Sequence, residues 1–318
     1  MRGLAIFVFA AAAFGQEQDQ MRYSVTLTEE GTVAPDAVNL IVLEPSFTYR
    51  HGDRWRFSTS LAAVTRTQDE TRAQIRVRET YFGVSVADLD VTIGKRLVRW
   101  GTGYAFTATG ILDPPRVATD PTDRLNLHEG REMVTADWVA GKHDFTAAWA
   151  MHRPGMPEIT ALRYNVLVDG FDTSVIVAHD GGGATFTGAN FTRVFGEAVE
   201  MHGEFAWRQG AAVLIGGKYT TRSGVTAIAE FYTPASITRQ HYGFLRVSKS
   251  RLRELPGWKE WDLAASLVAN LDDRSYTAVF DAGRRLGNHF YGYAHAEAPA
   301  GKTTPYSALA SIGVTFQL

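Results

Sequence analysis

Apolar and polar residues alternate with a period of two along most of the chain. The clearest run spans residues 306–318, in which even-numbered positions are apolar and odd-numbered positions are mostly small or polar. A period of two is typical of a β-strand with one apolar and one polar face. Residues 199–208 have an apolar stripe of the same kind, and their opposite face carries Glu200, His202, Glu204 and Arg208.

Short turn sequences separate these runs roughly every 12 to 20 residues. They contain the Gly and Asp residues that tight turns favour, as in residues 51–54, 169–172 and 222–224. No long stretch carries the apolar stripe of an amphipathic helix. The pattern therefore predicts an all-β chain that forms one antiparallel meander of about 18 strands.

The connections between these strands fall into two groups when they are assigned alternately to two sides. One side has the longer segments, such as residues 30–38 and 104–130, and the other has mostly tight turns, such as residues 87–88 and 169–172. Transmembrane barrels have this asymmetry, with longer external loops and short periplasmic turns. Residues 250–260 are an exception, because they form a longer connection on the side of the tight turns.

The N-terminal residues 1–15 have the features of a secretory signal peptide. Arg2 supplies a positive charge, residues 4–14 are apolar, and Gly15 precedes the predicted cleavage point. The alternative is a membrane-anchoring helix, which needs about 18 to 20 apolar residues and is therefore disfavoured. We expect the mature protein to span residues 16–318.

Composition narrows the function classes. The chain of 318 residues has no cysteine, which excludes disulfides, thiolate metal sites and cysteine nucleophiles. Its formal charge of -2 argues against a nucleic-acid-binding face. No later stretch is apolar enough for a membrane-spanning helix, so any insertion into a membrane must use strands.

A soluble β-sandwich also has alternating strands, but a chain of this length would normally divide into units of about 100 to 200 residues. No linker or change of composition divides this chain. We therefore predict a single closed antiparallel transmembrane β-barrel of about 18 strands, within a range of roughly 14 to 18, with an apolar outer face and a polar, wet inner face. Aromatic residues near strand ends would lie at the membrane interface, or in the core of a sandwich if the alternative holds: Phe47, Tyr49, Trp55, Phe57, Trp258 and Trp261.

With these features the chain resembles Gram-negative outer-membrane β-barrels of the porin type. Its last strand is similar to the C-terminal signal of that class, although it ends in Leu318 where the class usually has Phe. Residues 93–101 followed by residues 111–115 are also similar to a pattern in poorly characterised bacterial barrel families. The resemblance implies an outer-membrane location in a Gram-negative bacterium, contact with outer-membrane lipid, and insertion by the barrel-assembly machinery.

The segment from Tyr104 to Gly130 is the most unusual connection, because it is long and rich in charge and proline. Loops of this length are usually functional or disordered. We expect it to fold into the barrel as a constriction, with mixed charges acting on passing solutes. A solvated external loop and a calcium site at Asp113, Asp120 and Asp123 are alternatives. The charged loop residues assigned to the constriction are Arg116, Asp120, Asp123 and Arg124.

Charged residues on the predicted inner faces form a second candidate set. They would guide solutes electrostatically or, as the slightly favoured alternative, form a wet wall with cross-strand ion pairs. The basic members are Arg76, Arg78, Arg96, Arg208 and Lys218, and the others are Glu200, His202, Glu204 and Glu230.

No motif for catalysis, phosphate binding or metal binding is present in the sequence. The predicted function is a porin-like channel for passive or weakly selective passage of small solutes, without enzymatic activity, cofactor, metal or nucleic-acid partner. An outer-membrane enzyme of the lipase or protease type and a soluble carbohydrate-binding β protein remain as alternatives. The sequence leaves open whether the protein forms an oligomer.

Overall fold

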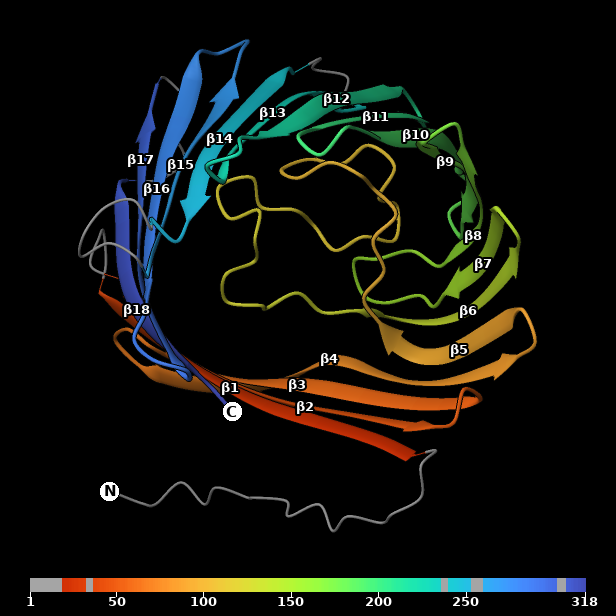
Figure 1. Cartoon of the computed structure of the whole chain (residues 1–318), viewed down its shortest axis with the longest axis horizontal. Helices are drawn as coiled ribbons and strands as arrows, with labels where there is room; N and C mark the ends of the chain where they lie inside the picture. Colours follow the sequence, from red (N-terminus) through yellow and green to blue (C-terminus); the bar gives the residue numbers. More distant parts are fainter. Residues whose placement is uncertain (1–18, 33–36, 236–239, 253–259, 302–306) are drawn as a thin grey trace.

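The described residues form a single closed sheet of 18 antiparallel strands. The structure is a computed structural model that describes residues 19–32, 37–235, 240–252, 260–301 and 307–318. Every strand pairs with its neighbours in sequence, and β1 also pairs with β18, which closes the barrel (Figure 1). The strands are β1 (Asp19–Thr32), β2 (Val38–His51), β3 (Trp55–Thr67), β4 (Thr71–Val86), β5 (Leu89–Arg96), β6 (Arg131–Ala140), β7 (His143–Ala150), β8 (Ile159–Val168), β9 (Phe171–Asp180), β10 (Thr185–Phe195), β11 (Val199–Trp207), β12 (Ala211–Thr220), β13 (Val225–Thr233), β14 (Tyr242–Ser250), β15 (Trp261–Asn270), β16 (Ser275–Arg285), β17 (Phe290–Ala300) and β18 (Leu309–Gln317).

The predicted fold class and strand number are therefore confirmed. No helix in the described part of the chain is long and apolar enough to cross a membrane. The N-terminal signal peptide and the proposed mature start at residue 16 lie outside the described residues and stay predictions. Trp258 also lies outside them.

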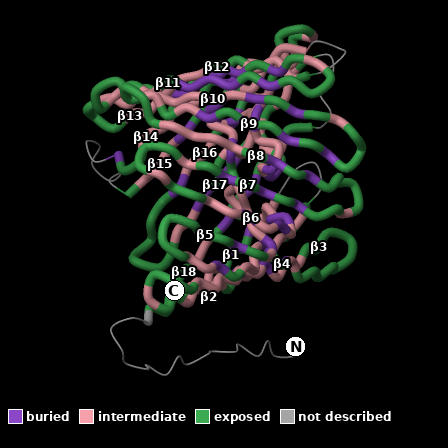
Figure 2. Tube along the Cα trace, turned by 90° about the vertical axis from the view of Figure 1, so that its right-hand side faces the viewer, coloured by how far each residue is buried: buried purple, intermediate pink, exposed green. Residues whose placement is uncertain are grey.

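The strands present apolar side chains outward and polar side chains inward, as the alternation predicts. On β11, Phe205 and Trp207 are 49% and 53% exposed, whereas Glu204 and Ala206, which alternate with them, are each 3% exposed. Exposed and buried positions alternate around the barrel in the same way (Figure 2). Burying an exposed apolar belt of this kind in lipid is favourable, and the closed sheet leaves no unpaired edge.

Connection lengths also follow the prediction. The end that holds residues 52–54, 87–88 and 169–170 has mostly tight turns, and the opposite end holds the long connection between β5 and β6. The segment between β14 and β15 is the longer connection on the turn end, and residues 253–259 within it are outside the described part. Aromatic side chains gather on the outer face beside the β2–β3 turn, where the rings of Phe47 and Phe57 lie 6.3 Å apart and Trp55 packs on Phe82.

The expectation of a uniformly polar interior is wrong for one part of the wall. The inner faces of β7 to β12 carry small apolar residues such as Ala148, Ala161 and Ala178, together with Ile176. They pack against apolar residues of the connection between β5 and β6, among them Trp100 and Leu112. An apolar inner wall is tolerated here because this segment covers it and excludes water.

Candidate functional site: the lumen loop and its anchors

Residues 97–130, here called the lumen loop, fold back into the barrel and cross its interior (Figure 1). The loop begins seven residues before the predicted start at Tyr104. Gly94, near the end of β5, has φ of +134° and lies close against β4, where a Cβ would be 2.3 Å from the carbonyl oxygen of Thr80, so the position requires glycine. The alternation of inward and outward side chains along β5 shifts by one residue at this glycine, so that Lys95 points inward and its Nζ lies 2.5 Å from the carboxylate of the loop residue Glu129.

Glu204 on β11 is the main anchor of the loop. Its two carboxylate oxygens accept hydrogen bonds from the backbone N–H groups of Thr102, Gly103, Ala108 and Thr109, at 2.5 to 2.8 Å. The hydroxyl groups of Thr102, Thr107 and Thr109 donate to it as well. A buried carboxylate needs such partners, because burying an unpaired charge away from water lowers the stability of the fold by roughly several kcal/mol.

Glu230 on β13 is the second anchor. It accepts hydrogen bonds from the backbone N–H groups of Tyr104, Ala105 and Phe106, the segment between the two stretches that bind Glu204. The fully buried His202 lies 3.0 Å from Glu230 through Nε2 and makes an edge contact with the ring of Tyr104. The loop therefore wraps its backbone around two wall carboxylates.

The close approach of the loop to the wall depends on Gly103. A Cβ at this position would lie 2.8 Å from Cδ1 of Leu214 and 2.3 Å from the carbonyl oxygen of Phe106. Any larger residue would push the loop away from β12 and weaken the bonds to Glu204 and Glu230.

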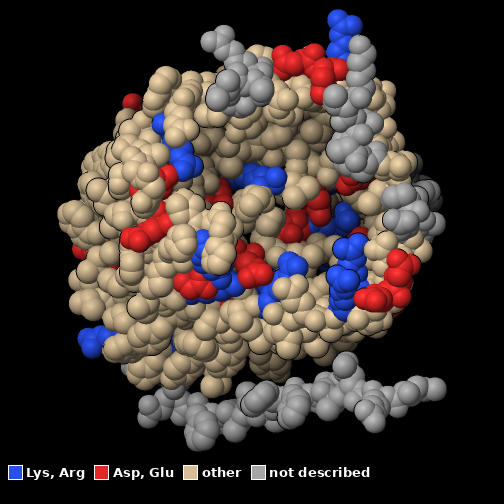
Figure 3. Space-filling model, turned by 180° about the vertical axis from the view of Figure 1, so that it is seen from behind, with Lys and Arg blue, Asp and Glu red and all other residues tan. Residues whose placement is uncertain are grey.

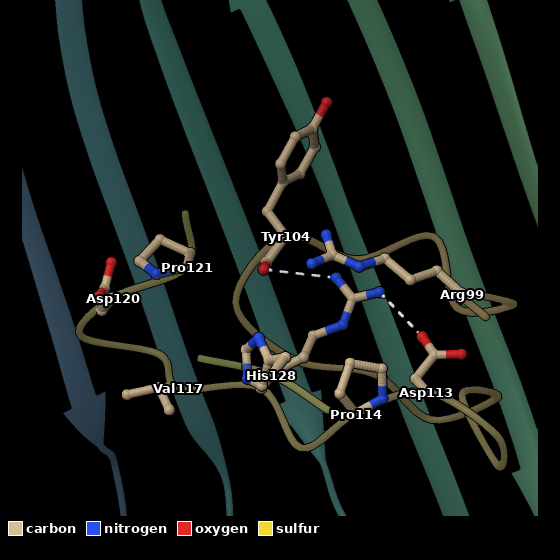
Figure 4. A pocket seen from close by; sticks show the side chains of 9 residues that line it. Arg99, Tyr104, Asp113, Pro114, Val117, Asp120, Pro121 and His128 are labelled. Atoms are coloured by element: carbon tan, nitrogen blue, oxygen red, sulfur yellow. Dashed lines mark hydrogen bonds and ion pairs between the residues drawn. The ribbon is translucent and has the colours of Figure 1, made fainter. Parts of the chain in front are cut away.

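The lumen loop also carries its own internal bonds. Asp113 accepts from the N–H groups of Trp100 and Gly101, and Arg116 bridges Asp113 and the carbonyl oxygens of Gly101 and Tyr104 (Figure 4). Burial raises the pKa of Asp113, against the opposing effect of these donors. Asn190 of β10 donates to the carbonyl oxygen of Trp100 and so joins this unit to the wall.

The distal part of the loop is fixed to the opposite wall. Arg124 contacts Glu30 of β1 at 3.2 Å, and the hydroxyl of Tyr293 donates to the same carboxylate at 2.7 Å. Burial acts to lower the pKa of Arg124, but Glu30 and Asp120 outweigh it and raise that pKa. Asn126 donates to Glu44 of β2, so attachments on both sides hold the loop across the lumen.

The sequence-predicted wall residues have different environments. Glu200 and Lys218 are directly opposite on β11 and β12 and form a 2.9 Å ion pair, which the hydroxyl of Tyr104 joins. Arg78 is buried against loop residues 126 and 128, and Arg76 lies 3.9 Å from Glu129. Arg96 contacts Thr92, Thr135 and Asp137.

Arg208 lines the same cavity as Thr107 and Ile111 of the lumen loop. It lies just beyond β11, in the turn that leads to β12, and pairs with Asp180 at the end of β9.

The carboxylates of the calcium alternative do not form one site. Asp113 binds the loop backbone and Arg116, Asp120 binds the N–H of Arg124, and Asp123 binds the N–H groups of residues 127 and 128. Within the described residues no group of three His, Asp or Glu side chains could hold a metal ion.

Sequence reasoning missed several residues that hold the loop. Each of these residues lies on the inner face of a strand and contacts the loop: Glu30, Glu44, Asn190 and, through its ring beneath Arg124, Tyr293. The inward phase of Glu30 and Glu44 could be read from the alternation, since they share a face with the threonines and serines of their strands. That both carboxylates bind the lumen loop could not be read from the alternation, because their partners Arg124 and Asn126 lie far away in the sequence.

Charged side chains are visible within the hollowed end of the barrel, where Lys and Arg lie beside Asp and Glu (Figure 3). The small cavity inside the loop has a volume of only about 20 Å³ and is lined by Arg99, Tyr104, Arg116 and His128 among others. That volume is comparable to a single water site, so it is not a solute-binding cavity.

Comparison with known proteins gives matches in structure but not in sequence. No family model and no curated protein matches the chain. The structure of Pseudomonas aeruginosa OccK5 (OpdH) aligns with a TM-score of 0.68 and 8% identity, over 95% of this chain and 98% of that one. Pseudomonas aeruginosa OprD aligns with a TM-score of 0.65 and 8% identity, over 94% and 95%.

A third similar structure is that of Wzi from Escherichia coli, an outer-membrane protein involved in group 1 capsule assembly and described as a carbohydrate-binding β-barrel. It aligns with a TM-score of 0.66 and 9% identity, over 92% of this chain and 84% of that one. At such low identity these likenesses concern the fold. The chain therefore has the fold of an outer-membrane β-barrel of the porin type.

Proposed function

We propose that this protein is an outer-membrane channel for small solutes and that the lumen loop is its constriction. The observation that carries the proposal is a closed barrel with an apolar outer belt whose lumen is crossed by a polar, charge-bearing loop fixed to the wall on both sides. The structures that share this fold include outer-membrane porins, which supports the same function.

Transport through such a channel is passive, with a selectivity set by the loop and by the charges that face it. The residues that would line or shape the passage are those of the predicted set that contact the loop or its surroundings, such as Arg76, Arg124 and Lys218. Glu204, Glu230 and His202 would act indirectly, because they are buried beneath the loop and hold it in place.

Conductance of the purified full-length protein in planar lipid bilayers tests the proposal. The wild type is expected to give discrete single-channel steps, and deletion of residues 117–125 is expected to increase the step size, because it removes the Arg124 attachment and widens the passage. A wild type without steps would refute the channel, and an unchanged step size in the deletion variant would refute the constriction.

An outer-membrane enzyme is disfavoured, because the side chains that could act as acids or bases are already bound to neighbouring groups of the protein. Glu200, His202 and Glu204 are engaged by Lys218, Glu230 and the loop backbone. A soluble protein is disfavoured by the exposed apolar belt, which would aggregate in water.

Location and assembly follow from the same proposal. The protein would be exported through its predicted signal peptide of residues 1–15 and inserted into outer-membrane lipid by the barrel-assembly machinery. Fractionation of Gram-negative cells, with heat-modifiable migration in gels, tests this placement.

A further inference from the structure

Arg193 is a cationic residue on the outer, lipid-facing side of β10. The burial pattern of this strand places Phe186, Gly188 and Asn190 inward, so its odd-numbered residues face outward. Arg193 comes two residues before the end of β10 at Phe195, which puts it about 7 Å along the strand from the turn end of the barrel. A position so close to the strand end corresponds to the membrane interface and not to the bilayer centre.

Apolar side chains surround Arg193 on this outer face. Phe171 is directly opposite on β9, and Met201 is directly opposite on β11. The guanidinium carbon of Arg193 lies 4.3 Å from the centroid of the Phe171 ring and 4.7 Å from that of the Phe195 ring. The ring of Phe191 makes an edge contact with that of Phe171. The guanidinium group thus packs against two rings, which restricts its position.

Arg193 has no acidic partner within the described part of the chain. Its guanidinium makes ring contacts there but no hydrogen bond or ion pair. Arg208, near the opposite end of the barrel, differs because it pairs with Asp180. A cation at a lipid surface is most stable when an anion reaches it, and phosphate oxygens match the planar donors of a guanidinium group.

Two more basic residues lie on the outer face at the turn end, on another part of the wall (Figure 1). Arg284 of β16 is directly opposite Trp261 of β15, and its guanidinium carbon lies 5.7 Å from the centroid of that ring. Lys249 of β14 shares the outer face of its strand with the exposed Leu245 and Val247. Positive charge on this side of the wall is complementary to anionic lipid headgroups.

We propose that the outer face of β9 to β11 at the turn end binds an anionic phospholipid, with the lipid phosphate at Arg193. The turn end of a transmembrane barrel is the periplasmic end, so the lipid would belong to the inner leaflet of the outer membrane. A lipid fits better than a free anion, because Phe195 and Met201 beside Arg193 are 41% and 42% exposed and acyl chains would cover them. The inference rests on the outer-membrane location and does not depend on conduction through the lumen.

Fluorescence quenching in vesicles tests the site directly. The chain has no cysteine, so Val199→Cys, on the outer face of β11 opposite Phe195, gives a single position for a bimane label. The full-length protein is placed in phosphatidylcholine vesicles that contain a small fraction of doxyl-labelled phosphatidylglycerol or doxyl-labelled phosphatidylcholine. The labelled phosphatidylglycerol is expected to quench roughly fivefold more effectively. A bimane label at Val91→Cys, on the outer face at the turn end of β5, is expected to show a ratio of about one.

Three variants assign the preference to the site. Arg193→Gln is expected to lower the quenching ratio at position 199 to about one and to leave quenching by phosphatidylcholine unchanged. Arg222→Gln is the matched control, because it removes the same charge from an exposed turn at the same end and should leave the ratio unchanged. Phe171→Leu/Phe195→Leu keeps the charge and removes the rings. It should lower the ratio by roughly half, and gives a second reading if Arg193→Gln does not form a heat-modifiable barrel.

Several outcomes would overturn the inference. These are a ratio near one in the otherwise wild-type protein, an unchanged ratio in folded Arg193→Gln, an equal loss in Arg222→Gln, or the same preference at position 91. Inorganic phosphate at the concentration of the lipid should not compete, and loss of the preference on its addition would show that the site takes a free anion. Single-channel conductance should be the same in Arg193→Gln as in the wild type, so failure of the channel and failure of the lipid site are distinguishable.

Discussion

At the scale of single residues, the structure shows that Glu204 acts as an anchor for a loop. Its side chain on the inner face of β11 follows directly from the alternation, but its role depends on the backbone N–H groups of residues 102–109 that surround it. A carboxylate suits this position because it offers several acceptor sites and no donor.

Glu204→Gln tests this role. The amide would place a donor against backbone N–H groups, so we expect a loss of stability of about 1 to 3 kcal/mol and a loosened loop. Increased single-channel conductance and faster cleavage by trypsin after Arg116 or Arg124 are the measurements. Glu70→Gln, in the exposed β3–β4 turn, is the control and should change neither.

Gly103→Ala tests the close approach of the loop to the wall. The added methyl group would overlap the carbonyl oxygen of Phe106 and the side chain of Leu214, so the loop should be displaced without a change in charge. We expect a conductance change in the same direction as for Glu204→Gln. Gly31→Ala, on β1 where a Cβ would meet no neighbour within 4 Å and the backbone is not left-handed, is the control.

At the scale of elements, the lumen loop is a folded unit with two attachment regions. Residues 101–109 bind the β11 and β13 wall, and residues 124–129 bind β1, β2, β4 and β5. The length and charge of the segment predict a functional loop, and its inward course agrees with the constriction hypothesis. The sequence pattern predicts the loop start at Tyr104, whereas β5 already ends at Arg96, because the end of this short strand is not distinguishable in the sequence from a continuing strand.

Removing the distal attachment should loosen one side of the loop only. Arg124→Gln leaves the buried carboxylate of Glu30 without its cation, whereas Glu30→Gln/Arg124→Gln removes both charges. We expect current fluctuations to increase in both variants and the barrel to be less stable in the single than in the double variant, by about 1 to 3 kcal/mol. Equal stability of the two variants in urea unfolding would show that the Glu30–Arg124 pair is solvated and does not stabilise the barrel.

At the scale of the whole molecule, the apolar outer belt and the closed sheet explain how the described residues can span a membrane with strands. The belt consists of side chains that alternate with the inner ones on each strand, for example Leu267 outside and Ser266 inside on β15. The inner wall is not uniform, since one part is apolar and covered by the loop while other parts carry charged pairs.

Leu267→Arg tests the orientation of the barrel wall. A charge on the lipid face of a transmembrane barrel costs about 2 to 4 kcal/mol near the bilayer midplane. We therefore expect reduced stability in lipid vesicles, measured by urea titration of the folded form. Leu267→Ala is the size control and should cost less, while an Arg variant as stable as the Ala variant would contradict contact with lipid.

The strands, the phase of most side chains and the barrel class can be predicted from the amino-acid sequence, because these depend on a local period of two and on turn residues a few positions apart. The sequence also indicates that residues 104–130 are unusual. The course of that loop, the carboxylates that hold it and the apolar part of the inner wall emerge only in the folded barrel. Those features arise from contacts between residues such as Glu204 and Thr109, about a hundred positions apart, and no local pattern encodes which distant partner will satisfy a buried charge.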